Sequence, residues 1–432
     1  MRKRSSFRPA IIFASEESSW QSCKSIVRNL LAAYERLPEM AGGRRFQFND
    51  DMGAVRETAL RIFEFAPDRL VFVDHWPHPH LLIRALAALY GRRALPPIYF
   101  HVYGDFTLYA REWLSIEPIL KKTKVRFICA SRRQRALVRS FCARSPEAAF
   151  RVCHFPVDRA QFGSKPAART EWRARHGIRS DETVVSYSGR MSLQKNVWEL
   201  TQEVYEAWSQ GNRNLRLVLA GGFDNLGAPF FGIELSPGAY YHYWRTRLNR
   251  LPAEFRSRVH FLGHCSLSEL DGVYNATDVF ASLSLHHDED FGMAPAEALA
   301  SGSVAVLSSW GGYASFKLSP ASCQLVPVKI GEGVLVYSSA AFQTGLDRLS
   351  RAPQDDLARA ARSSRFLDVF SIEAASAILS SVHIEKLGFN FKGFSWIMRK
   401  QGRQEPIRFS EGMRKGTFYA EIYKHYAQET RR

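Results

Sequence analysis

The stretch LHHDEDFGMAPAEALASG, from Leu285 to Gly302, decides the fold of this chain. A short apolar run, Val279–Ser282, precedes it and leads into a polar loop. Pro295 then stands where a helix is expected to begin, a position that suits proline because an N–H would be unpaired there. Glu289 in the loop and Glu297 in the first helical turn lie eight positions apart. Because helix N-termini carry unpaired amides and a partial positive charge, this strand–loop–helix unit is suited to a diphosphate.

The pattern around this stretch recurs along most of the chain, where short apolar runs alternate with longer helical patterns. Such alternation predicts an α/β fold with parallel sheets, and 432 residues are enough for two domains. We expect a Rossmann-like domain over 1–165, a second over 166–365, and a basic helical extension over 366–432 that packs back on the first domain. Two doubly wound domains would bind ligands in a cleft between the carboxyl ends of their sheets.

The apolar runs also predict the individual strands. In the first half the expected strands are Ala10–Ala14, Leu70–Val73, Ile98–Val102, Val125–Cys129 and Arg151–Phe155. In the second half they are Thr183–Ser188, Leu215–Ala220, Val259–Leu262, Val279–Ser282 and Val304–Leu307.

The composition is that of a globular protein, with 46% hydrophobic and 23% charged residues. No run approaches the ~20 apolar residues of a membrane span. The apolar stretch Ala10–Ala14 is shorter than the roughly 7–15 residues of a signal-peptide core. The six cysteines are scattered without a C-x-x-C pair, which disfavours a zinc site or a disulfide framework. We therefore expect a soluble cytoplasmic protein.

The segment from 285 to 302 resembles the E-x7-E signature of the retaining GT-B glycosyltransferases, in particular those of family four. These enzymes carry Glu-x-Phe-Gly, then a Glu-Ala pair and a glycine, and the matching residues here are Glu289, Phe291, Gly292, Glu297, Ala298 and Gly302. The resemblance implies that Glu297 binds the ribose hydroxyls of a nucleotide-sugar donor and that Glu289 lies near the donor sugar. It also implies that the amides of Phe291, Gly292 and Met293 line the sugar and phosphate site.

The same residues admit a metal-dependent alternative. Asp288, Glu289 and Asp290 form a D-x-D pattern, which in GT-A glycosyltransferases holds a divalent metal on the diphosphate, and His286 and His287 could add ligands. GT-A enzymes place this pattern after an N-terminal nucleotide-binding half, whereas here it lies late in the chain. The E-x7-E signature also accounts for the surrounding residues. We therefore expect no metal and no cofactor other than the donor substrate.

A second motif, SGRMSLQKN from Ser188 to Asn196, supplies cations in place of a metal. Gly189 lets the backbone approach a ligand, and Arg190 and Lys195 place two positive charges on one loop. Family four enzymes carry Gly-Arg shortly before Lys-Asn or Lys-Gly at this position, so the resemblance implies that these cations bind the diphosphate and stabilise its departure. Further segments that resemble the family are VLAGG (Val218–Gly222), VHFLGH (Val259–His264) and WGGYASF (Trp310–Phe316), the last without the family's usual acidic residue.

The first domain resembles the family less closely. FPVDRAQF, Phe155 to Phe162, matches the family's hinge with one residue missing, and the usual glycine pair after the first strand is replaced by SEESSWQS. The resemblance implies that His101, at the end of an expected strand, contacts the donor sugar; a purely structural histidine is the alternative. Side chains that follow the same strand and its neighbour are candidates for the acceptor, namely Asp74, His75, Trp76 and Asp105.

The formal net charge of +17 implies an anionic partner or a solvated basic surface. Ten Lys or Arg and one Glu lie between Lys121 and Arg151, and the centre of this run, Arg132–Arg144, has helical period. Residues 390–432 add ten Lys or Arg against four Glu. Basic amphipathic helices favour an anionic membrane surface; a phosphate-rich glycolipid, RNA and a solvated helix are the alternatives, with nucleic acid less favoured.

Together these patterns predict a retaining, metal-independent glycosyltransferase that acts in the cytoplasm, peripherally on the inner membrane. It would move a sugar from a nucleoside-diphosphate sugar to a glycan, a lipid-linked acceptor or another acceptor held by the first domain. The alternative is a GT-B protein that has lost catalysis and docks on nucleic acid or membrane. The combination of Arg190, Lys195, Glu289 and Glu297 argues against that alternative.

Overall fold

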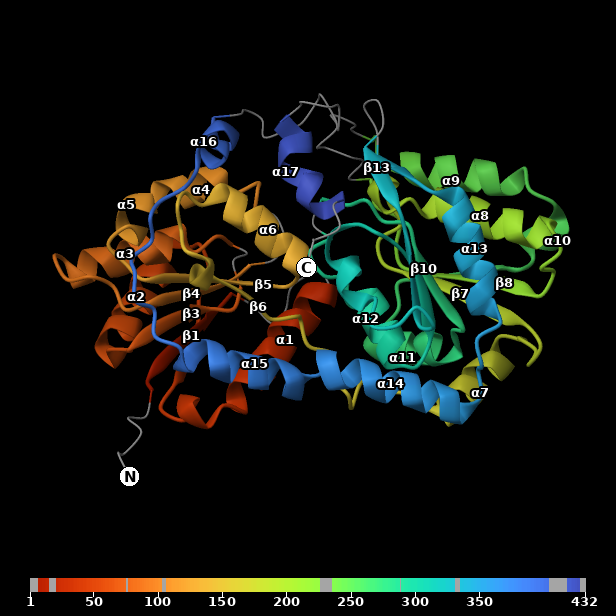
Figure 1. Cartoon of the computed structure of the whole chain (residues 1–432), viewed down its shortest axis with the longest axis horizontal. Coiled ribbons are helices and arrows are strands. Elements are labelled where there is room, and N and C mark those ends of the chain that lie inside the picture. Colours follow the sequence, from red (N-terminus) through yellow and green to blue (C-terminus); the bar gives the residue numbers. More distant parts are fainter. Residues whose placement is uncertain are drawn as a thin grey trace. The chain divides into compact units, whose positions relative to one another are not determined.

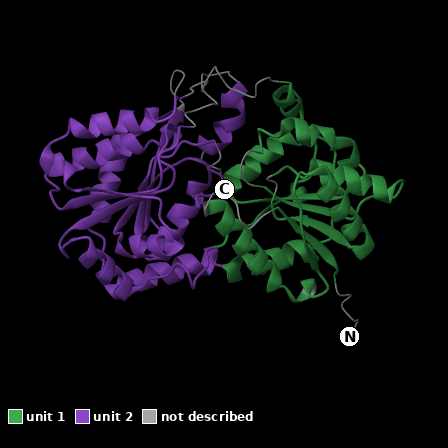
Figure 2. Cartoon of the chain, turned by 180° about the vertical axis from the view of Figure 1, so that it is seen from behind, with its two compact units in different colours: residues 1–156, 372–407 green, residues 157–371, 408–432 purple. Residues whose placement is uncertain are grey.

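The computed structural model describes residues 7–14, 21–74, 77–102, 106–225, 235–287, 289–330, 335–403 and 418–427. The chain forms two compact units (Figure 2). Unit 1 comprises 1–156 and 372–407, and unit 2 comprises 157–371 and 408–432. The unit boundaries, after 156 and after 371, lie nine and six residues from the expected limits at 165 and 365, and the C-terminal region is shared between the units.

Unit 1 contains a six-stranded parallel sheet in the order β2-β1-β3-β4-β5-β6 (Figure 1). Its strands are β1 (Pro9–Phe13), β2 (Arg44–Gln47), β3 (Arg69–Phe72), β4 (Ile98–Val102), β5 (Val125–Cys129) and β6 (Phe150–Val152). Its helices are α1 (Gln21–Glu35), α2 (Met52–Phe65), α3 (His80–Tyr90), α4 (Ala110–Ser115), α5 (Glu117–Leu120), α6 (Arg132–Phe141), α15 (Ile372–Ile384) and α16 (Trp396–Gly402).

Unit 2 contains a second six-stranded parallel sheet in the order β12-β11-β10-β7-β8-β9. Its strands are β7 (Thr183–Ser188), β8 (Leu215–Ala220), β9 (Val259–Gly263), β10 (Val279–Ser282), β11 (Val304–Ser308) and β12 (Cys323–Val326), with a separate antiparallel pair, β13 (Val328–Ile330) and β14 (Leu335–Tyr337). Its helices are α7 (Pro166–Arg175), α8 (Val197–Ser209), α9 (Ala239–Asn249), α10 (Ala253–Arg256), α11 (Leu267–Ala276), α12 (Met293–Ala300), α13 (Ser339–Ser350), α14 (Asp356–Phe370) and α17 (Phe418–Ala427).

Both sheets reverse their strand order next to their first strand, which is the arrangement of doubly wound folds. The α/β prediction is therefore confirmed. The expected strands are present with bounds that differ by a few residues, whereas β2 and β12, one edge strand of each sheet, were not expected. In β2 only Phe46 is buried, so its sequence lacks the apolar run by which the other strands were predicted.

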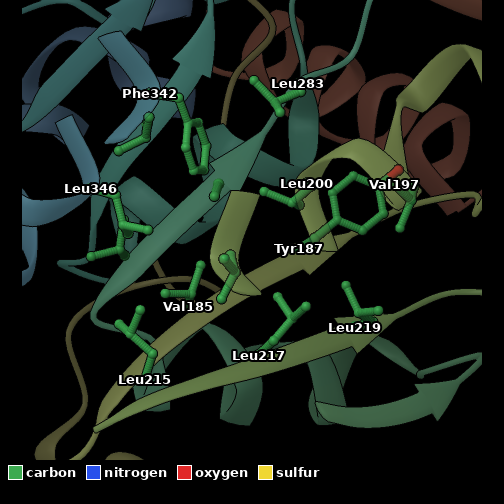
Figure 3. Close-up of a cluster of buried hydrophobic side chains, with 14 of the residues drawn as sticks. Val185, Tyr187, Val197, Leu200, Leu215, Leu217, Leu219, Leu283, Phe342 and Leu346 are labelled. Atoms are coloured by element: carbon green, nitrogen blue, oxygen red, sulfur yellow. The ribbon is translucent and has the colours of Figure 1, made fainter. Parts of the chain in front are cut away.

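The main core of unit 2 lies between its sheet and helices α8 and α13 (Figure 3). Val185 and Leu217 on adjacent strands meet Leu200 of α8 and Phe342 of α13, and all four side chains are buried. The central strands are buried on both faces, which explains why their sequences are continuous apolar runs rather than alternating ones. This core holds the ends of β7 and β10 in place.

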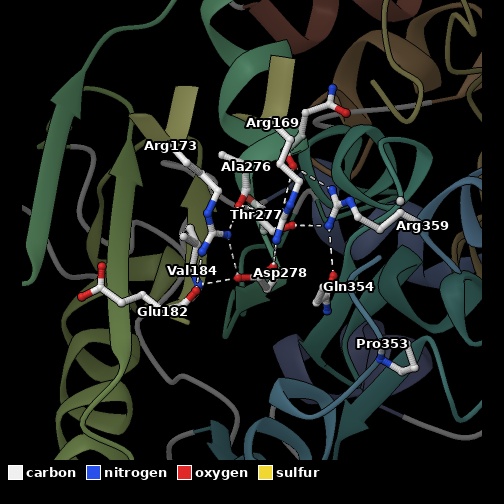
Figure 4. A network of polar contacts seen from close by, with 12 residues as sticks. Arg169, Arg173, Glu182, Val184, Ala276, Thr277, Asp278, Pro353, Gln354 and Arg359 are labelled. Atoms are coloured by element: carbon white, nitrogen blue, oxygen red, sulfur yellow. Dashed lines mark hydrogen bonds and ion pairs between the residues drawn. The ribbon is translucent and has the colours of Figure 1, made fainter. Parts of the chain in front are cut away.

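A buried polar network is built around Asp278, immediately before β10 (Figure 4). Its carboxylate accepts hydrogen bonds from Arg169 (2.6 Å), Arg173 (3.1 Å) and the amide of Val184 (2.7 Å). Arg359 of α14 donates to the carbonyls of Asn275, Thr277 and Ser301. Burial lowers the pKa of the Arg359 guanidinium to about 9. Since Ser301 follows the last residue of α12, this network anchors the C-terminal end of that helix.

None of the helices within the described ranges combines the length and the apolar composition needed to cross a bilayer.

Candidate functional site

The cationic loop follows β7 directly and depends on two glycines. Gly189 has φ +138° and Gly221, after β8, has φ +140°. A Cβ atom on Gly221 would lie 1.9 Å from the carbonyl oxygen of Gly189, so the two loops approach as closely as their backbones allow. This contact fixes the start of the loop that carries Arg190.

Arg190 is held by side chains from two other loops of unit 2. Its guanidinium donates to Asp224 Oδ2 at 2.6 Å and lies 3.2 Å from Nε2 of His286. About a quarter of its side chain is exposed. Arg190 is therefore oriented but remains accessible, as a cation that contacts a ligand must be.

Lys195 brings the cationic loop to the acidic loop. Its ammonium donates to Glu289 Oε2 at 2.6 Å, and the hydroxyl of Ser284 donates to the same oxygen at 2.6 Å. The side chains of Lys195 and Glu289 are 16% and 7% exposed. Two residues that the sequence analysis singled out on separate motifs thus form a largely buried ion pair.

The acidic loop reaches α12 through Gly292, which has φ +100°. A Cβ atom on Gly292 would lie 2.4 Å from the ring of Tyr313, so only glycine fits without displacing that ring. The Trp310–Phe316 segment contacts the loop directly: the amide of Gly312 donates a hydrogen bond to the carbonyl of Glu289 at 2.6 Å. Helix α12 begins at Met293, so Pro295 is its third residue rather than its first. The first turn still loses one donor at that proline.

Glu297 on α12 is linked by hydroxyl groups to the start of the cationic loop. Its Oε2 accepts a hydrogen bond from Tyr274 of α11 at 3.2 Å, and the same hydroxyl lies 2.5 Å from Oγ of Ser188. Burial, reinforced by the Glu297 carboxylate, raises the pKa of Tyr274 well above its usual value. The hydroxyl therefore keeps its proton and can donate a hydrogen bond. Ser188, Tyr274 and Glu297 thus connect the two motifs through one chain of hydrogen bonds.

Both loops lie at the edge of the sheet where ligands of α/β folds bind. Strands β7 and β10 are adjacent, and the strand order reverses between them. Gly189–Lys195 follows the carboxyl end of β7, and the acidic loop follows the carboxyl end of β10. In open α/β sheets, ligands bind outside the carboxyl ends of the strands at this reversal point.

The carboxylates of the metal-dependent alternative have other partners. Asp290 accepts a hydrogen bond from the hydroxyl of Tyr426, Glu289 is paired with Lys195, and Asp288 lies outside the described residues. His287 Nδ1 lies 3.2 Å from Oε1 of Gln194. Within the described ranges, no group of three or more His, Cys, Asp or Glu side chains has the arrangement of a metal site. Independence from metal stays a prediction.

In unit 1, His101 lies in a buried network rather than on an open surface. Its Nε2 is 2.7 Å from the hydroxyl of Tyr34, which lies 3.2 Å from Nε2 of His383, and Arg69 donates to the carbonyl of His383 at 2.9 Å. Burial lowers the pKa of His101 to about 3, so the ring is neutral. This geometry gives His101 a packing role between β4 and α1; its contact with a donor sugar stays a prediction. Asp74 is buried just after β3.

The remaining acceptor candidates are not described structurally. His75, Trp76 and Asp105 lie outside the described residues, so their assignment to an acceptor stays a prediction.

Much of the basic run of unit 1 is neutralised or buried. On α6, Leu137 and Phe141 are buried and so is Arg133, so the apolar face of this helix belongs to the core. Glu147 lies within 3.7 Å of Arg135 and 3.5 Å of Arg139. The charge of α6 available to an anionic surface is therefore smaller than the sequence indicates, and membrane association stays a prediction.

Sequence reasoning missed the residues that hold the site together. Asp224, Tyr274 and Ser284 each contact a predicted site residue, yet they lie on three different elements. Asp224 lies two positions after VLAGG, and Ser284 directly precedes the Leu285–Gly302 stretch, so proximity to a recognised motif was a local signal for both.

Comparison with known proteins identifies the same part of the chain. Residues 168–317 match the family described as Glycosyl transferases group 1. A D-inositol 3-phosphate glycosyltransferase from Corynebacterium aurimucosum is 28% identical over 223 residues, which cover 50% of this chain and 46% of that protein. The chain thus spans about half the length of this curated relative.

Two solved structures are similar over most of the chain. The sucrose-phosphate synthase from Thermosynechococcus elongatus has a TM-score of 0.61 at 17% identity, covering 87% of this chain and 98% of its own. HepE from Anabaena in complex with UDP has a TM-score of 0.63 at 14% identity, covering 87% and 99%. These similarities confirm the predicted fold class. The chain has the GT-B fold, and its residues 168–317 match the model of the group 1 glycosyltransferase family.

Proposed function

We propose that this protein transfers a sugar from a nucleoside-diphosphate sugar to an acceptor with retention of the anomeric configuration. The observation that carries the proposal is the meeting of the Arg190–Lys195 loop with the Glu289–Glu297 segment at the reversal point of the second sheet. The family match covers both motifs. The curated relative is named as a glycosyltransferase, and Anabaena HepE has been solved with UDP and with UDP-glucose.

Each side chain has a distinct role in this proposal. The carboxylate of Glu297, oriented by Tyr274, accepts hydrogen bonds from the two ribose hydroxyls of the nucleotide. Arg190 and Lys195 bind the diphosphate, and the N-terminus of α12 adds its unpaired amides. Fixed cations near a leaving diphosphate stabilise the charge that develops in the transition state.

Retention follows from attack on the same face of the sugar that the diphosphate leaves. The departing diphosphate takes the proton of the acceptor hydroxyl, so no enzyme nucleophile is needed. Glu289 lies beside the donor sugar, and Lys195 and Ser284 fix the orientation of its carboxylate. The acceptor is a glycan or a lipid-linked sugar bound by unit 1.

Nucleotide binding is expected to raise the thermal stability of the protein. UDP, GDP and ADP, with their sugars, should be compared by thermal shift, because a ligand that binds only the native state stabilises it in proportion to its affinity. The diphosphate of the true donor should give the largest shift, and Glu297→Ala should abolish most of it. Glu171→Ala, at an exposed side chain of α7, is the matched control. An equal shift in Glu297→Ala and wild type would exclude the ribose contact.

Glycosyl transfer is expected to persist in EDTA, because Arg190 and Lys195 supply the positive charge that a metal would otherwise supply. The assay measures release of the nucleoside diphosphate after extensive dialysis against EDTA, with and without added manganese. Proton NMR of the product gives its anomeric configuration, which should equal that of the donor. A strict manganese requirement, or an inverted product, would contradict the proposal.

A further inference from the structure

Helix α17 packs within unit 2 on β13 and on the segment Gly311–Phe316, and it contacts the acidic loop through Tyr423 and Tyr426. The hydroxyl of Tyr426 donates to Oδ1 of Asp290, which stands between Glu289 and Phe291 in the sequence but 136 positions before Tyr426. The ring of Tyr426 lies edge-on to Trp310, with centroids 5.7 Å apart, and Tyr423 stacks on the same tryptophan at 6.5 Å. Helix α17 therefore contacts both the loop and the segment that supports it.

Trp310 links this aromatic cluster to the loop by a hydrogen bond. Its Nε1 donates to the carbonyl of His286 at 2.8 Å. The aromatic ring of Tyr426 also lies against Gly311, since a Cβ atom on that glycine would come 3.1 Å from it. The loop is thus held at His286 by Trp310 and at Asp290 by Tyr426.

The charge of Asp290 shows why this contact matters. Asp290 and Glu289 are adjacent carboxylates, and Glu289 is paired with the ammonium of Lys195. If the Asp290 carboxylate turned toward the diphosphate site, it would repel an anionic donor and compete for the same cations. The hydrogen bond from Tyr426 keeps this carboxylate on the side of the loop that faces α17.

We propose that Tyr426 is a positioning residue for donor binding, which acts through Asp290 and does not touch the donor. This inference rests on the proposed function of the loop. A tyrosine near the end of the chain would thereby determine the affinity of a site whose recognised motifs end at Phe316.

The test is Tyr426→Phe in the full chain, which removes one hydroxyl and keeps the ring. Loss of a hydrogen bond of ordinary net strength predicts an increase of about three- to tenfold in the Kd for UDP and in the donor KM, with a smaller change in kcat. Hydrogen exchange of peptides within 286–292 should become faster without ligand, while exchange in the strands of unit 2 is unchanged. Lys424→Ala, at an exposed position of the same helix, should behave as wild type.

The outcomes separate this proposal from the function on which it rests. Unchanged UDP affinity in Tyr426→Phe would overturn it, and so would faster exchange throughout unit 2, which indicates a merely structural role. Asp290→Asn combined with Tyr426→Phe should weaken binding less than the sum of the two single changes; strict additivity would also overturn it. If the wild type binds no nucleoside diphosphate, the proposed function fails. Amide hydrogen exchange of the peptides within 286–292 still decides whether Tyr426 holds the loop.

Discussion

Replacing Arg190 with alanine is expected to lower the turnover of glycosyl transfer by roughly 10²–10³-fold, with a similar loss for Lys195→Ala. Both cations are preorganised, Arg190 by Asp224 and Lys195 by Glu289, so they need little rearrangement when charge develops on the leaving diphosphate. Initial rates at saturating donor separate this effect on kcat from weaker donor binding.

The controls distinguish loss of a site cation from loss of positive charge. Arg175→Ala removes an exposed arginine of unit 2 that is paired only with Glu171 among the contacts described, and it should leave turnover unchanged. Arg190→Lys keeps the charge but loses the planar fork, so it should recover only part of the rate. Wild-type turnover in the Arg190/Lys195 double alanine variant would refute the proposed site.

Replacing Asp278 with alanine is expected to lower the free energy of unfolding by about 3–5 kcal/mol. This carboxylate is the shared partner of Arg169 and Arg173 and also accepts the amide of Val184. Without it, two largely buried guanidiniums lose their counter-charge close to Arg359. Urea unfolding followed by circular dichroism gives the change from the midpoint and the slope.

Asp278→Asn and Asp181→Ala provide graded comparisons. The asparagine can still accept the amide of Val184 but carries no charge, so its effect should be smaller than that of alanine. Asp181 forms an exposed pair with Arg179, so Asp181→Ala should leave the unfolding midpoint close to that of the wild type. Equal unfolding midpoints for Asp278→Ala and Asp181→Ala would show that the network contributes no net stability.

The parts of the fold that the sequence predicts are those determined by local pattern. Strands such as β4 and β8 are short runs of apolar residues. A run of this length and composition predicts a strand that is buried on both faces. β2 was missed because a polar edge strand with one buried residue, Phe46, has no such pattern. The division of the C-terminal region between the two units depends on tertiary packing, which no local pattern encodes.

The candidate site divides in the same way. Arg190, Lys195, Glu289 and Glu297 could be located because their motifs have characteristic spacings. Their supporting contacts join residues far apart in the chain, such as Ser188 with Tyr274, and cannot be obtained from spacing. His101 stands at a strand end where a ligand contact is expected, and its hydrogen bond to Tyr34 in the core is likewise not encoded by spacing. Its contact with a donor sugar stays a prediction.

The return of α15 to unit 1 affects how the protein folds during synthesis. Helix α15 packs on α1, and His383 closes the buried network of Tyr34 and Arg69. The ribosome therefore completes the sheet of unit 1 and then synthesises residues 157–371 before this helix appears. At a translation rate of roughly 5–20 residues per second, synthesis of 157–371 takes about 10–40 seconds. During this time the apolar surface of α1 that α15 later covers remains exposed. Nascent unit 1 is thus expected to be a chaperone client until translation passes residue 384.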